Sequence, residues 1–101
     1  MSERDIIIGD LIAKCGADVT AAMLRTAALG DTPNERFAIT VAGAAAALGI
    51  ATGACMDLAE AEGGSIDAAN SIAAIWKVLQ PMALGAANKS AAEHAPPIGK
   101  Q

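Results

Sequence analysis

Apolar residues recur at intervals of three and four along the N-terminal part of the chain, while charged residues occupy the opposite positions. This spacing is typical of one face of an amphipathic helix. Ser2 and Asp5 form an S-x-x-D start signal, and Gly30 is a stop signal. We therefore predict a helix over residues 3–29. Its apolar stripe consists of Ile8, Leu11, Ile12, Cys15, Val19, Ala22 and Met23.

The strongest helix start in the chain is the run Thr32-Pro33-Asn34-Glu35. Threonine supplies an oxygen acceptor, proline at the first helical position fixes φ, and glutamate at the third position supplies a reciprocal acceptor. The next stop signal is the pair Gly63-Gly64. The sequence therefore predicts a second helix over residues 33–62.

Downstream of the glycine pair, apolar positions again repeat at three and four, and we expect Ser65 to cap a third helix over 66–80. Pro81 must either kink that helix or break it into a separate fourth helix over 82–93. Residues 95–101 are expected to be a disordered tail. The fold class predicted is an all-α, antiparallel up-down bundle of three helices, or four with a break at Pro81, in a single domain over residues 1–94.

Residues 37–56 carry no charge, which raises the question of whether they span a membrane. Few of them are strong membrane formers, no aromatic belt flanks them, and the lysine and arginine bias is slight. In a soluble protein, a helix that is apolar all round needs partners on every side. We expect a second copy to cover it across a twofold axis, although a folded-back fourth helix is an alternative. The predicted self-association residues are Ala42, Gly43, Ala46, Gly49, Ile50 and Gly53.

Composition supports an oligomer, because 26 of the 101 residues are alanine and the only aromatic residues are Phe37 and Trp76. Alanine favours helix but buries little area. A net charge of −4 and the lack of a basic run argue against a nucleic-acid partner. The N-terminus does not form a secretory signal, so we expect a cytoplasmic protein.

Candidate chemistry is sparse. Cys15 and Cys55 lack redox or zinc spacing and are interpreted as small buried hydrophobic residues. Four acidic residues surround the second turn without a histidine nearby, and no nucleophile elbow or P-loop is present. We therefore predict that the protein is not an enzyme and holds no metal or cofactor. The acidic residues are Asp57, Glu60, Glu62 and Asp67.

These observations predict a small cytoplasmic protein that self-associates and acts on another protein as an adaptor, inhibitor or assembly component. Trp76 is either a core anchor or an exposed hot spot for that partner. One alternative is a holin-like membrane-active protein using residues 37–56 as a weak transmembrane helix. Another is a small-molecule binder or minor enzyme with a pocket lined by Met23, Met56, Trp76 and Met82.

Overall fold

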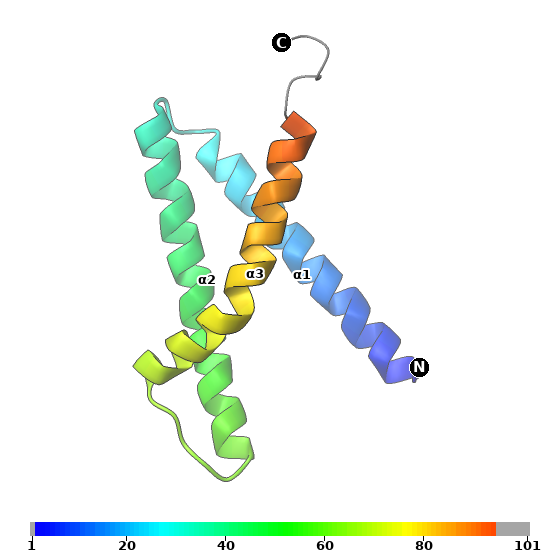
Figure 1. Ribbon diagram of the computed structural model, residues 1–101. Coiled ribbons are helices and arrows are strands. Elements are labelled where there is room, and N and C mark those ends of the chain that lie inside the picture. The colour runs from blue at the N-terminus through cyan, green and yellow to red at the C-terminus, as the bar shows by residue number, and fades with distance from the viewer. Residues whose placement is uncertain (1, 95–101) are drawn as a thin grey trace. The chain divides into compact units, whose positions relative to one another are not determined.

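A computed structural model describes residues 2–94, with side-chain surroundings for residues 2–89, and confirms the all-α, three-helix prediction. The helices are α1 (Glu3–Ala27), α2 (Pro33–Ala61) and α3 (Ala68–His94) (Figure 1). The chain forms two compact units, Met1–Ala47 and Leu48–Gln101, whose boundary lies inside α2. The predicted tail over 95–101 lies outside the described residues, and the single domain over 1–94 stays a prediction.

In the first unit, α1 and the beginning of α2 run in opposite directions (Figure 1). The predicted start of α1 is confirmed by a capping box: the Asp5 N–H donates to Ser2 Oγ at 3.1 Å, and the Ser2 N–H donates to the Asp5 carboxylate at 3.3 Å. The helix ends two residues before the predicted end. The amide of Gly30 donates to the carbonyl of Ala27, so the last residues form a tighter turn than an α-helix.

The start of α2 is also confirmed. Thr32 Oγ1 accepts the Glu35 N–H at 3.1 Å, while the Glu35 carboxylate accepts the N–H of Asp31, one residue before the cap, at 2.7 Å. The Arg36 guanidinium donates to the Gly30 carbonyl at 3.0 Å. Side chains of the first turn of α2 therefore hold the loop that joins it to α1.

In the second unit, α2 ends in a Schellman motif at the predicted glycine pair. Gly63 has a φ of +86°, and its N–H donates to the Glu60 carbonyl at 3.0 Å. The Gly64 N–H donates to the Ala59 carbonyl at 2.9 Å. These bonds satisfy carbonyls that would otherwise lack a partner at the end of the helix.

The predicted cap of the third helix at Ser65 is wrong. Asp67 caps α3, because its carboxylate accepts the Asn70 N–H at 2.7 Å and the Asn70 side-chain amide at 3.1 Å. An ionised carboxylate is a stronger acceptor for a helix N-terminus than a hydroxyl. The helix therefore begins at Ala68 rather than at residue 66.

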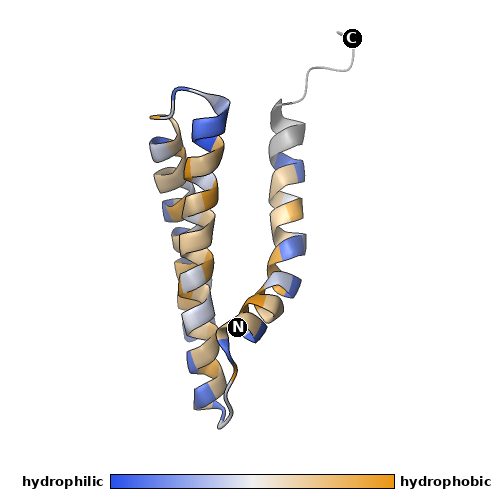
Figure 2. Ribbon diagram, turned by 90° about the vertical axis from the view of Figure 1, so that its left-hand side faces the viewer, coloured by the Kyte–Doolittle hydropathy of each residue, from blue (hydrophilic) through white to orange (hydrophobic). Residues whose placement is uncertain are grey.

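The predicted break at Pro81 is also wrong, since α3 continues through this residue and no separate fourth helix forms within residues 2–94. The alternative prediction of a bend holds: α3 bends in its yellow part in Figure 1, and Figure 2 shows the same bend. Proline removes one backbone hydrogen bond and collides with the carbonyl of Lys77. Residues 76–89 are all exposed, so water can hydrate that carbonyl and the bend meets no packed neighbour.

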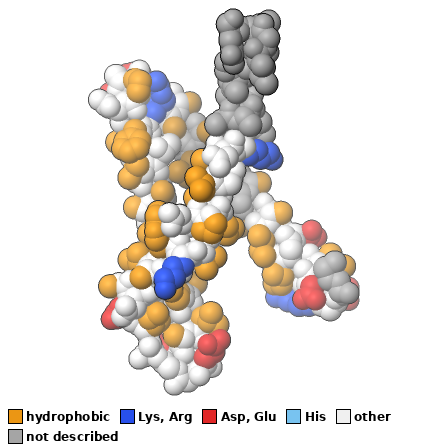
Figure 3. All heavy atoms as spheres, in the orientation of Figure 1, with side chains coloured by type: hydrophobic (Ala, Val, Ile, Leu, Met, Phe, Trp, Pro, Cys, Tyr) orange, Lys and Arg blue, Asp and Glu red, His pale blue; other side chains and the backbone are white. Residues whose placement is uncertain are grey.

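Very little of the chain is buried. Among residues 2–89, only Ala27, Thr52 and Ser71 are buried, and hydrophobic side chains lie at the surface (Figure 3). The interpretation of both cysteines as buried is wrong for Cys15, which is exposed, while Cys55 is half-buried. Alanine-rich faces bring few atoms into contact, because a methyl group does not reach far across the space between helices.

Four helical threonines donate their hydroxyls to backbone carbonyls of their own helices. The Oγ1 atoms of Thr20 and Thr26 donate to carbonyls four residues earlier at 2.8 and 3.0 Å. Thr40 and Thr52 donate in the same way at 3.0 and 2.7 Å. These hydroxyls thus have partners without help from another element.

Gly63→Ala should destabilise the chain by about 1–2 kcal/mol, because an L-residue with a Cβ is strained at positive φ. Gly64→Ala is the matched control, since a Cβ there meets only the Ala59 carbonyl at an ordinary 3.7 Å. Urea unfolding followed by helical circular dichroism measures both variants. Equal unfolding midpoints would contradict the role given to Gly63.

Ser71→Ala should leave the free energy of unfolding unchanged or raise it. The Ser71 side chain is fully buried and its Oγ has no hydrogen-bond partner within the described residues. The change turns the CH2–OH side chain into a methyl group, and removing the unsatisfied buried hydroxyl removes a desolvation cost of about 1–3 kcal/mol. Thr52→Ala is the contrasting variant, because it removes a hydroxyl that is already satisfied. A clear loss of stability in Ser71→Ala, measured by thermal unfolding, would show that this hydroxyl is bonded.

Candidate functional site

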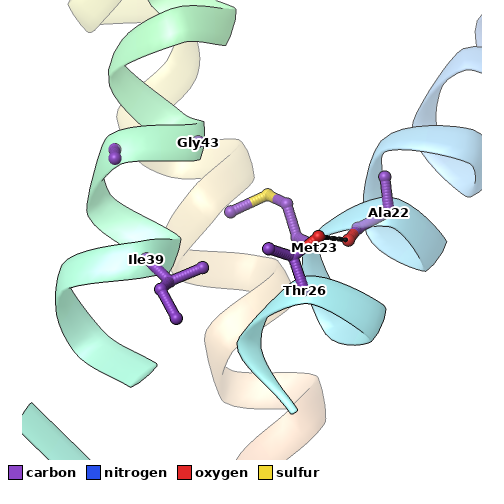
Figure 4. A pocket seen from close by; sticks show the side chains of 6 residues that line it. Ala22, Met23, Thr26, Ile39 and Gly43 are labelled. Atoms are coloured by element: carbon purple, nitrogen blue, oxygen red, sulfur yellow. Dashed lines mark hydrogen bonds between the residues drawn. The ribbon is translucent and has the colours of Figure 1, made fainter. Parts of the chain in front are cut away.

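An apolar pocket of about 510 Å³ lies between α1 and α2 within the first unit (Figure 4). Its volume falls within the range of about 300–1,000 Å³ that is common for binding pockets. Its walls combine the last turns of α1 with the second and third turns of α2. The lining residues are Ala22, Met23, Thr26, Ile39, Ala42 and Gly43.

One contact across this pocket brings Met23 of α1 beside Gly43 of α2, where an added Cβ would make an ordinary van der Waals contact. The Met23 side chain extends toward Gly43 (Figure 4), and a Cβ on that glycine would lie 3.4 Å from Met23 Cε. The hydroxyl of Thr26 is already used, because it donates to the Ala22 carbonyl at 3.0 Å. The pocket therefore offers hydrophobic contact but no free side-chain donor to orient a polar ligand.

The six predicted self-association residues divide into two groups. Ala42 and Gly43 line the pocket, and Gly43 is half-buried. The other four are exposed, with Ile50 at 77% exposure and open space around the positions where Gly49 and Gly53 would carry a Cβ. Their role in self-association stays a prediction. The exposed four are Ala46, Gly49, Ile50 and Gly53.

The methionine and tryptophan residues predicted to line a ligand pocket have different surroundings. Met23 lines the pocket described above, where its neighbour from α2 is Gly43. Met56 is half-buried, whereas Trp76 and Met82 are 54% and 66% exposed. In this chain Trp76 is therefore not a core anchor, and its role as a partner hot spot stays a prediction.

No reactive constellation emerges from the described residues. Within residues 2–89, whose side chains the structure describes, no group of three or more histidine, cysteine, aspartate or glutamate side chains is arranged to hold a metal ion. The acidic residues near the second turn have local roles where the structure shows one, as Asp67 does in capping α3. The predicted lack of enzyme activity and of a cofactor stays a prediction.

Two of the pocket residues, Thr26 and Ile39, were not singled out by the sequence reasoning. A signal for Ile39 existed, because it precedes Ala42, Gly43 and Ala46 at three- and four-residue spacing on one face of the helix. Thr26 follows Ala22 and Met23 at four- and three-residue spacing, on one face of α1. What the spacing could not supply is the axial register in which the two faces meet.

Comparisons with protein families, with curated proteins and with solved structures find no match to this chain.

Gly53→Leu should reduce self-association while keeping or raising helical content. The site is open in the single chain, and leucine gains up to about 1 kcal/mol in helix propensity over glycine. If copies approach closely at this glycine, each leucine adds an overpacking cost of about 1–3 kcal/mol. Gly85→Leu in α3, also an open position, is the control. For both variants, sedimentation equilibrium measures association and circular dichroism measures helical content. If Gly53→Leu associates as strongly as the parent protein, the self-association interface lies away from Gly53.

Proposed function

We propose that this chain is a small helical protein that self-associates and acts through protein–protein interaction, as an adaptor, an inhibitor or an assembly component. The supporting observation is the exposure of large apolar side chains on all three helices (Figure 3). Examples with at least half of their surface exposed are Ile12 and Leu24 in α1, Phe37 and Ile50 in α2, and Trp76 in α3.

Such surfaces favour association because each square ångström of apolar surface removed from water contributes about 25 cal/mol. Within residues 2–89, a single apolar residue, Ala27, is buried inside the chain, so the core contributes little. A second copy of the chain is the simplest partner, because it carries the same apolar surfaces and is present at the same concentration. Twofold symmetry allows the two copies to bury these surfaces against each other. Exposed residues outside that contact, Trp76 among them, then remain for a different protein.

Net charge narrows the range of partners. At −4 and with a sequence pI near 4.7, the chain repels phosphate backbones and anionic lipid headgroups. We accordingly propose a cytoplasmic protein whose partners are itself and another protein rather than a nucleic acid.

A second candidate, the holin-like membrane-active protein, is favoured by one specific observation. Helix α2 is long and apolar enough to cross a membrane. Its most apolar stretch of 18 residues has a mean hydropathy of 1.8, and only 6% of that stretch is buried. The uncharged residues between Arg36 and Asp57 span about 30 Å as a helix, near the thickness of a hydrocarbon core. A bilayer around α2 nevertheless leaves the exposed apolar residues of α1 and α3 uncovered, which is why self-association ranks first.

The purified protein should be a dimer or larger in water without detergent, since association buries the exposed apolar side chains. Light scattering at micromolar concentration checks this, and a mass near the 10.0 kDa of one chain would contradict the proposal. Carbonate extraction of expressing cells separates the two candidates: release into the supernatant supports the soluble oligomer, and retention in the pellet supports the membrane-active protein.

A further inference from the structure

We draw no further inference here: the strongest candidate, the apolar pocket between α1 and α2 together with the apolar stripe of α1 beside it, is an unpartnered apolar face, and nothing in the structure shows what covers it.

Discussion

The need to satisfy the backbone groups at helix ends governs this structure more than side-chain burial does. Local bonds close the start of α1 and both connections: a capping box at Ser2, the Thr32 and Glu35 pair, the Schellman motif at Gly63 and the Asp67 cap. Local bonds determine where helices begin and end, but they contribute only about 0.5–2 kcal/mol each. Within residues 2–89 only Ala27, Thr52 and Ser71 are buried, so side-chain packing adds little to these local bonds.

The alanine content explains why burial is so limited. A bundle of leucine-rich helices fills the space between axes with long side chains, whereas methyl groups fill it only at very short interaxial distances. Here Met23 lies beside Gly43, but an added Cβ on that glycine would meet Met23 Cε at an ordinary 3.4 Å, so the methyl-bearing faces are not in such close contact. Even this contact leaves a hollow beside it, because the neighbouring wall positions are Ala22 and Ala42. The pocket is thus a direct consequence of composition.

The all-α class and most helix ends could be predicted from the sequence, because caps and stop signals act within a few residues of one another, whereas the choice between three and four helices at Pro81 stayed open. The two errors arose where local signals competed: Asp67 replaced Ser65 as the cap of α3, and α3 continued through Pro81 because its exposed flank can bend. The pocket could not be predicted. It depends on which turn of α1 faces which turn of α2, and the loop bonds of Arg36 and Glu35 fix that register in three dimensions.

The back-bonded threonines of α2 have a consequence for the solvent that this helix can tolerate. Moving a free hydroxyl from water into an apolar medium costs several kcal/mol, but a hydroxyl that already donates to its own backbone loses much less. Thr40 and Thr52 are the hydroxyl-bearing residues of the uncharged segment, and both make such a bond. Neither one therefore fixes the segment in the aqueous phase. Between Arg36 and Asp57, these two threonines carry a lower cost of removal from water than two free hydroxyls would.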